Sequence, residues 1–193
     1  MKENNTKKEV REVAIKLFKK NGFDAITLND ICSAAGISKN TFYYYFSSKE
    51  DLLKEKIELS PLSHSSFTDL LLLTSPYDQY KELARQHISH FQQCGKEIMK
   101  KILHEKVSGS FSHSSSTDKE DLRRLFELQT SLIQRAQEQK EIMNRSDPKI
   151  LARAAAAMLI GLFQIWTTDN SITSNIEEEY FVLLDILLQK KED

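Results

Sequence analysis

The sequence contains few of the residues that interrupt helices or cross-link chains. Among its 193 residues there are 5 glycines, 3 prolines and 2 cysteines. Scarce helix breakers favour long helices over many strands and turns, and Cys32 and Cys94 alone make no disulfide framework. No apolar run reaches the roughly 18 residues of a membrane span, and the charged start has no apolar signal segment. We therefore expect no membrane partner and a cytoplasmic location.

Sequence motifs of catalysis are also missing. The chain has no glycine-rich phosphate loop, no G-x-S-x-G nucleophile motif and no H-E-x-x-H zinc motif. It also has no pair of carboxylates framed by a pocket pattern. The sequence therefore predicts a protein that is not an enzyme and that uses no cofactor.

Charge is distributed unevenly, although the net charge is only −1. Residues 1–56 contain 11 Lys/Arg and 8 Asp/Glu, whereas the remaining residues contain 16 and 20. A basic first quarter on an acidic body indicates an anionic partner at one end of the chain. The excess is small, so ordinary solvated helix faces explain the charge equally well.

Apolar residues in the first quarter repeat with helical spacing. In residues 6–20 they form one stripe, made of Val10, Val13, Ala14, Leu17 and Phe18. Gly22 can end this helix, Thr27 can cap a second one, and Gly36 can stop the second after about two turns. A third short helix follows Gly36, and the Ser-Ser-Lys-Glu stretch at 47–50 has the spacing of a capping box for a fourth. This order predicts a helix-turn-helix.

The third helix carries five consecutive aromatic residues, Phe-Tyr-Tyr-Tyr-Phe at 42–46. At about 100° per residue its two phenylalanines share one side, so we expect both in the core. The opposite side consists of Asn40, Thr41, Tyr43 and Tyr44, with Lys39 and Tyr45 on its flanks. These side chains can hydrogen-bond, and a helix fits the major groove of DNA, where base edges offer donors and acceptors. Packing of the tyrosines on a neighbouring domain is the alternative.

The stretch TLNDICSAAGISKNTFYYYFSSKEDLL, residues 27–53, resembles the DNA-binding segment of the TetR (tetracycline-repressor-like) family of bacterial transcription regulators. The resemblance covers roughly residues 6–56. It implies a homodimeric regulator, usually a repressor, that binds a palindromic operator in double-stranded DNA and is released by a small-molecule effector.

Carried over position by position, the resemblance assigns DNA contacts to the third helix and to two flanking helix ends. The candidate residues are Thr27, Ser38, Lys39, Asn40, Thr41, Tyr43, Tyr44, Tyr45 and Lys49. Thr27 and Lys49 match positions that touch phosphate, and helix N-termini offer free N–H groups for this purpose. Asn40 departs from the glycine often found at its position. It can contact a base or change how closely the backbone approaches.

The remaining chain also has helical periodicity. We expect helices over 77–107 with a break at Gly95, over 119–145, from Pro148 onward and over 176–190, with a mobile loop at 108–118. The predicted fold class is all-α. An N-terminal three-helix helix-turn-helix domain at 1–50 precedes a larger helical ligand-binding and dimerisation domain at 51–193, with about nine helices in total.

Two C-terminal helices carry more apolar surface than one subunit can cover. We expect a dimer built as a four-helix bundle, with burial inside a monomer as the alternative. The predicted interface residues are Ile150, Ala154, Ala157, Gly161, Ile165, Tyr180, Leu184 and Leu187. The nearly continuous apolar stretch at 154–166 is too short to span a membrane.

A ligand pocket is expected among the middle helices, because aromatic walls with a few polar groups are typical of such sites. The candidate residues are Phe67, Tyr80, His87, Phe91, Ile102, Phe126, Gln129 and Trp166, which favour a hydrophobic or aromatic effector. His87, His90 and Cys94 have helical spacing that could hold a metal. No Cys-x-x-Cys accompanies them, so we assign no metal ligand. A metal-sensing regulator, and a helical interaction protein that does not bind DNA, remain alternatives.

Overall fold

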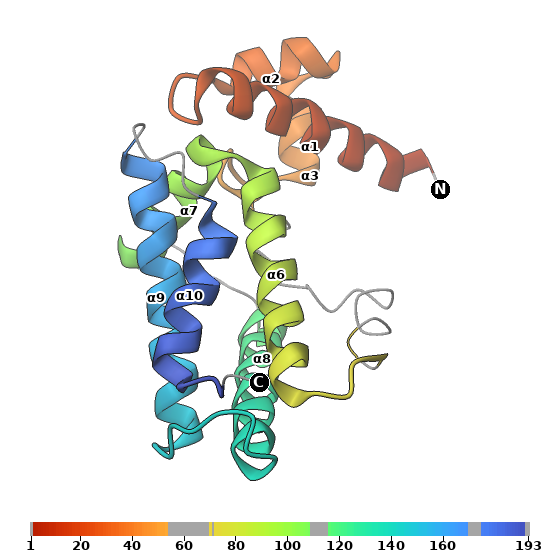
Figure 1. Cartoon of the computed structure of the whole chain (residues 1–193). Coiled ribbons are helices and arrows are strands. Elements are labelled where there is room, and N and C mark those ends of the chain that lie inside the picture. Colours follow the sequence, from red (N-terminus) through yellow and green to blue (C-terminus); the bar gives the residue numbers. More distant parts are fainter. Residues whose placement is uncertain (1, 54–69, 71, 109–115, 170–174, 192–193) are drawn as a thin grey trace. The chain divides into compact units, whose positions relative to one another are not determined.

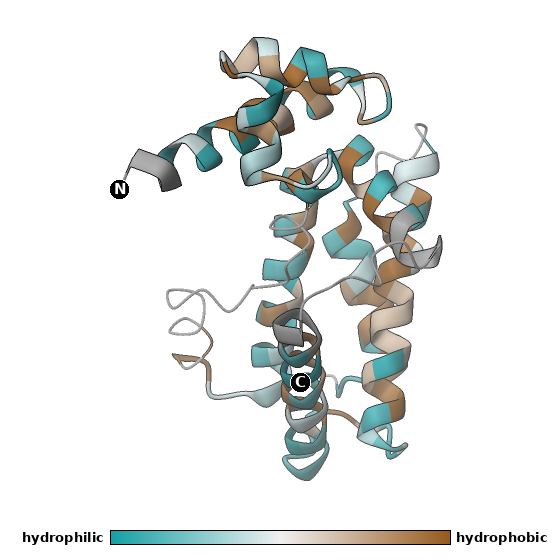
Figure 2. Ribbon diagram, turned by 180° about the vertical axis from the view of Figure 1, so that it is seen from behind, coloured by the Kyte–Doolittle hydropathy of each residue, from teal (hydrophilic) through white to brown (hydrophobic). Residues whose placement is uncertain are grey.

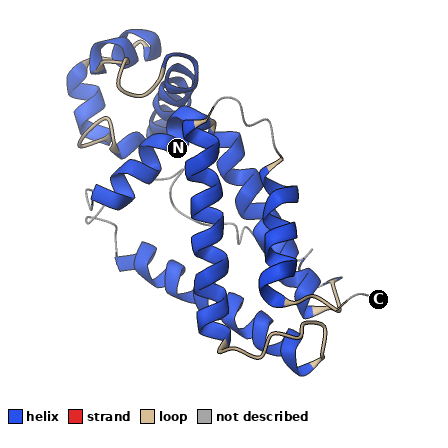
Figure 3. Ribbon diagram, turned by 60° about the vertical axis from the view of Figure 1, so that its left-hand side comes forward, coloured by secondary structure: helices blue, strands red, loops and turns tan. Residues whose placement is uncertain are grey.

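Helices make up the regular structure in the part of the chain that is described here (Figure 3). The structure is a computed structural model that describes residues 2–53, 70, 72–108, 116–169 and 175–191. Within these residues eight helices have defined bounds, and the β-structure is limited to a single bridge between Ile142 and Lys190. The predicted all-α fold class is confirmed.

The chain divides into two units. The first comprises residues 1–58 and 94–110, and the second comprises residues 59–93 and 111–193. Helices α1 (Lys2–Asn21), α2 (Leu28–Ala35), α3 (Lys39–Tyr45) and α7 (Lys96–Ser108) belong to the first unit. The second contains α6 (Pro76–Cys94) up to its last residue, α8 (Ser116–Glu138), α9 (Pro148–Thr168) and α10 (Ile176–Leu188).

The first unit is built on the apolar stripe of α1. Val10, Ala14 and Phe18 on this helix are buried, and α1 packs against α2 and α7 (Figure 1). Gly22 ends α1 with a φ of 85°, a conformation that glycine adopts without strain, and its N–H donates to Phe18 O. The predicted first helix and its termination are confirmed.

Helix α7 groups with the N-terminal unit, whereas the sequence places it in the C-terminal domain. Gly95, with a φ of 88°, separates it from α6, as the predicted break requires. Ile98 and Ile102 on α7 are completely buried. Ile102, a predicted pocket residue, therefore belongs to a different unit from the other described pocket candidates.

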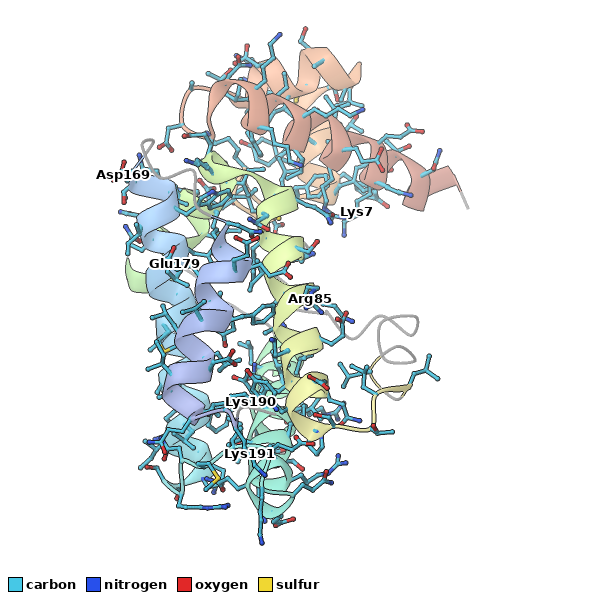
Figure 4. All side chains as sticks on the ribbon, in the orientation of Figure 1. Lys7, Arg85, Asp169, Glu179, Lys190 and Lys191 are labelled. Atoms are coloured by element: carbon cyan, nitrogen blue, oxygen red, sulfur yellow. The ribbon has the colours of Figure 1, made fainter. Side chains whose placement is uncertain are left out.

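Residues 141–144, predicted as the end of a helix over 119–145, instead pair with the end of α10. Met143 N–H donates to Gln189 O at 3.0 Å, and Lys191 N–H donates to Glu141 O at 3.1 Å. Figure 4 shows Lys190 and Lys191 at this end of α10. The helical prediction was wrong here because a sequence period does not register backbone partners distant in the chain.

The N-terminus of α6 is held by acidic side chains from two other segments. Glu141 accepts the Tyr77 N–H at 2.8 Å, and Asp185 accepts the Tyr77 hydroxyl. Burial raises the pKa of Asp185, although the positive charge of Lys190 opposes this shift. Further along α6, Arg85, which Figure 4 labels, donates from its Nε to Glu177 of α10 at 2.8 Å.

We expect Asp185→Asn to stabilise the protein at neutral pH. Because the pKa of Asp185 is raised in the folded state, its protonated form contributes to the free energy of unfolding. This contribution is fully present below the unfolded-state pKa and is lost as the pH rises through the folded-state pKa. Asparagine keeps an acceptor for Tyr77 without the cost of burying a charge. Thermal unfolding from pH 3 to pH 8 should show a difference in Tm between variant and wild type that grows with pH. A variant whose Tm is lower at pH 8 would contradict this assignment.

Helix α9 is long and apolar enough, by length and composition alone, to cross a membrane. It has 21 residues, and only 33% of its most apolar stretch of 18 residues is buried. Figure 2 colours much of this helix brown or pale. The prediction that this stretch is too short was therefore wrong. Core helices of soluble proteins can be equally long and apolar. What distinguishes α9 is that most of its apolar stretch is not buried.

Candidate nucleic-acid interface

Two turns fix the position of α3. Gly36 adopts a φ of 64° at the end of α2, and Ile37 N–H donates to Cys32 O at 3.0 Å, so the chain reverses tightly after α2. Ser38 then caps α3, because its Oγ accepts the Thr41 N–H at 3.1 Å. These two contacts confirm the predicted turn and cap of the helix-turn-helix.

The two faces of α3 have opposite character. Phe42 and Phe46 are buried at 0% and 2% exposure, whereas Tyr43 and Tyr44 are exposed at 58% and 70%. Lys39 and Asn40 are also exposed, and Thr41 and Tyr45 are partly exposed. The predicted inward phenylalanines and outward tyrosines are confirmed. A helix therefore presents hydrogen-bonding side chains on a rigid apolar base.

Basic residues of α1 lie beside the end of α3. Lys7 Nζ is 5.8 Å and Arg11 Cζ is 5.5 Å from the centroid of the Phe46 ring, within cation–π range. Figure 4 labels Lys7. The sequence showed the basic excess but not this contact, because it joins residues more than 30 positions apart. The contact places positive charge next to the tyrosine-bearing helix.

Thr27 forms a reciprocal cap with Asp30 at the start of α2. Thr27 Oγ1 accepts the Asp30 N–H at 3.2 Å, and Asp30 Oδ2 accepts the Thr27 N–H at 2.8 Å. The hydrogen bonds from Thr27 lower the pKa of Asp30. The predicted cap is confirmed. The phosphate contact of Thr27 stays a prediction. In this structure the Thr27 backbone N–H already donates to the Asp30 carboxylate.

The predicted capping box between Ser47 and Glu50 is wrong. The Ser47 N–H and hydroxyl both donate to Asp51 Oδ2, at 2.9 and 3.0 Å. A carboxylate one residue later therefore fulfils the capping role.

Lys49 makes internal contacts that the sequence analysis missed. Its Nζ donates to Phe23 O at 2.7 Å and to Ile26 O at 2.9 Å, and it lies 4.1 Å from the centroid of the Phe23 ring. Lys101 of α7 reaches the same ring at 5.0 Å. The ammonium group thus points into its own unit rather than outward as the predicted phosphate contact.

The predicted effector residues of α6 are in the core of the second unit. Tyr80, His87 and Phe91 are buried, and burial raises the pKa of Tyr80 to about 12 while a hydrogen bond with Tyr180 opposes that shift. His87 Nδ1 is 2.8 Å from Leu83 O. Phe67 lies outside the described residues.

The other described pocket candidates of this unit are Phe126, Gln129 and Trp166, which are half-buried. Phe163, which the sequence analysis did not select, connects α6 to Trp166. Its ring lies edge-on to Phe91 at 5.6 Å and to Trp166 at 6.1 Å. Its spacing of three residues before Trp166 was the available signal.

The metal-sensing alternative receives no support from the described residues. Among them no group of three or more His, Cys, Asp or Glu side chains is placed to hold a metal ion. Cys94 is buried at 3% exposure. His87, His90 and Cys94 lie on the same helix, but their side chains do not form a group that could hold one metal ion.

The residues predicted for a dimer face differ in exposure, and the interface itself stays a prediction. Ile150 and Ile165 on α9 are exposed at 60% and 47%, and an added Cβ at Gly161 would meet no atom within 4 Å. Tyr180 and Leu184 on α10, in contrast, are buried at 2% and 0%, so they are core residues and not interface residues.

The remaining predicted residues of this face are Ala157, which is exposed, and Ala154 and Leu187, which are half-buried. The exposed apolar residues of α10 are instead Val182 and Ile186, at 60% and 70%. Periodicity could not separate the buried side of α10 from its exposed side, because both sides are apolar.

The N-terminal residues match a known family. Residues 10–55 match the model of the bacterial regulatory proteins of the tetR family. The uncharacterized HTH-type transcriptional regulator YerO of Bacillus subtilis is 46% identical over 55 residues, which are 28% of this chain and 19% of that protein. The probable acrEF/envCD operon repressor of Escherichia coli K12 is 25% identical over 173 residues, covering 83% and 76% of the two chains.

The match to the first of these relatives therefore spans about a fifth of that relative's length, 19%. Among solved structures, the lauroyl-CoA complex of Thermus thermophilus FadR, a TetR-family repressor, has a TM-score of 0.64 at 18% identity, covering 97% of each chain. AibR in complex with isovaleryl coenzyme A and operator DNA has a TM-score of 0.66 at 14% identity, covering 96% and 100%.

These findings agree on the class of protein. Residues 10–55 belong to the TetR family of bacterial regulatory proteins, and the chain has the fold of TetR-family transcriptional regulators. The matched proteins are transcriptional regulators rather than enzymes.

Proposed function

We propose that this protein is a ligand-responsive transcriptional repressor of the cytoplasm that binds a palindromic operator through α3. The observation that carries the proposal is the contrast between the two faces of α3 in a chain that matches the tetR family. Tyr43 and Tyr44 are large aromatic residues that stay exposed to solvent, although their rings lie edge-on to those of their neighbours Phe42 and Tyr45. Their rings can contact sugars or thymine methyl groups, and their hydroxyls can reach phosphate.

The proposed DNA contacts keep the residues of the sequence prediction with one change. Ser38, Lys39, Asn40, Thr41, Tyr43, Tyr44 and Tyr45 lie on or beside α3, and Thr27 lies at the start of α2. Lys39 and Asn40 are exposed in the first turn of α3, where recognition helices commonly contact base edges. Lys49 is the change, because its ammonium is committed to backbone carbonyls.

We further propose a homodimer formed through α9 and α10. From Ile150 onward the exposed residues of α9 are spaced so that they share one face, at Ile150, Arg153, Ala157, Ile160, Gly161, Gln164, Ile165 and Thr168. Helix α10 packs against α9 (Figure 1), and its Val182 and Ile186 are exposed. Only 33% of the most apolar stretch of α9 is buried. In water, the exposed apolar side chains of such a helix need a second protein surface to cover them.

The proposed effector is a small hydrophobic or aromatic molecule. Two proteins of the same fold were solved with acyl-coenzyme A molecules, lauroyl-CoA and isovaleryl coenzyme A. In this chain the edge-to-face series Phe91, Phe163 and Trp166 supplies aromatic surface in the second unit. Tyr80 and His87 add polar groups from the same face of α6, as ligand sites commonly require.

Selection of binding sequences from a random DNA library tests the proposal. We expect enrichment of an inverted repeat with half-sites about 10 base pairs apart or a multiple of this, because two recognition helices must meet successive major grooves. Lauroyl-CoA is then titrated into the labelled complex as a first probe. Release of DNA with a change in Trp166 emission, the only tryptophan in the chain, is the expected response to an effector of this class.

The outcome that overturns the proposal is specific. A folded protein that enriches no sequence, and that binds the library as weakly as it binds unrelated DNA, would favour the interaction-protein alternative. Release by a different hydrophobic compound, with no response to lauroyl-CoA, would support the proposed effector class and exclude only lauroyl-CoA as the effector.

A further inference from the structure

Lys49 makes three contacts in the first unit. An ammonium group has three N–H donors and no acceptor. Two of them point to Phe23 O and Ile26 O, at 2.7 and 2.9 Å. The nitrogen also lies 4.1 Å from the centroid of the Phe23 ring, close enough for a cation–π interaction. The positive charge of Lys49 therefore interacts with backbone carbonyls and an aromatic ring of its own unit.

These contacts join the two ends of the helix-turn-helix. Phe23 O and Ile26 O belong to the turn between α1 and α2, and Ile26 directly precedes the Thr27 cap of α2. Lys49 follows α3 by a few residues and is 23 positions from Ile26. The Lys49 bridge therefore closes the α2–turn–α3 segment into a ring.

Both ends of this bridge are themselves fixed. Phe23 is 3% exposed and its ring packs 4.7 Å from that of Phe18. On the other side, Leu52 N–H donates to Lys49 O at 3.2 Å, and the Ser47–Asp51 contacts hold the same turn. Lys49 thus connects two ordered segments, and its removal would free the end of α3 relative to the start of α2.

We propose that Lys49 is a positioning residue for operator recognition and not a phosphate contact. The proposal rests on the function proposed above. Hydrogen bonds weaken steeply when donor–acceptor distances or angles change, so base contacts from a helix of only 7 residues depend on how its two ends are held. Lys49 holds one of those ends at the start of α2.

The test compares Lys49→Met with Lys39→Met. Both variants remove one lysine from the same unit, but Lys39 is exposed at the start of α3, whereas Lys49 is internally bonded. Binding to the selected operator and to unrelated DNA of equal length is measured by fluorescence anisotropy at several salt concentrations. All measurements are made well below the Tm of each variant, so that only folded protein is compared.

We expect Lys49→Met to weaken operator binding about tenfold or more, with unrelated DNA bound as before and the salt slope unchanged. Lys39→Met should instead lower the magnitude of the salt slope by about 1. Lys49→Arg retains charge and donors, so it should recover most of the operator affinity. If Lys49→Met is not folded by circular dichroism, Lys49→Gln, which keeps amide donors, is measured in its place.

Two results would overturn the proposal. A Lys49 variant that weakens both DNAs equally and lowers the salt slope by about 1 would identify a phosphate contact. A variant with a lower Tm but unchanged operator affinity would identify a residue that serves stability alone. The proposed function fails in a different way, because wild-type protein would then show no preference for any selected sequence.

Discussion

Ala157→Glu is expected to convert the protein to monomers and to lower its operator affinity by about 10²–10⁴-fold, the range that linked binding sites commonly contribute. Ala157 is exposed near the middle of the α9 face, where its neighbours one turn away are Gly161 and Ala154. Small side chains at these positions let two helices approach closely. A glutamate there would either block the approach or bury an unpaired charge, which is costly in a protein interface.

The large effect on DNA follows from the two-fold arrangement. One recognition helix makes few base contacts, each worth about 1–3 kcal/mol. Two helices held about 34–36 Å apart read both half-sites in one binding event. A monomer loses this gain although its α3 is unchanged, so the substitution acts on operator binding from the other unit of the chain.

Sedimentation velocity and anisotropy with the selected operator measure the two effects. Ser131→Glu is the matched control, because it adds the same charge at an exposed helical position of α8 in the same unit, outside the α9 and α10 faces. The control should sediment and bind as wild type. If Ala157→Glu still sediments as a dimer with full affinity, the interface lies elsewhere.

Local signals explain why the first unit could be predicted well. Gly22, Thr27, Gly36 and Ser38 each act through their own backbone conformation or through a contact at most four residues away. The separation of Phe42 and Phe46 from Tyr43 and Tyr44 also follows from helical geometry alone. Such features need no knowledge of tertiary structure.

Long-range contacts explain where the predictions failed. Lys49 and its carbonyl partners are 23 and 26 positions apart, and no residue type or spacing announces that bridge. On α10 the apolar residues surround the helix, so periodicity could not decide that Tyr180 and Leu184 face the core while Val182 and Ile186 face solvent. Which side of α10 is buried depends on its packing against other helices such as α9, and the sequence of α10 alone does not contain this information.

Tyr44→Ala is expected to weaken operator binding by about 1–3 kcal/mol, roughly ten- to a hundredfold, without a change in Tm. The side chain is 70% exposed, so its truncation leaves the core intact and surface changes of this kind seldom exceed about 0.5 kcal/mol in stability. Tyr44→Phe separates the two parts of the side chain. A variant that retains affinity would assign the contact to the ring, and one that behaves like alanine would assign it to the hydroxyl.

Phe42→Ala, two positions earlier, provides the opposite case. Phe42 is 0% exposed, and its ring centroid lies 5.3 Å from that of Phe46. Its truncation should therefore lower the free energy of unfolding by about 3–5 kcal/mol. It should abolish DNA binding together with the structure of the first unit, as seen in thermal unfolding by circular dichroism. If Tyr44→Ala instead destabilised the protein and left operator binding intact, the tyrosine face would be a packing surface and not the surface that reads DNA.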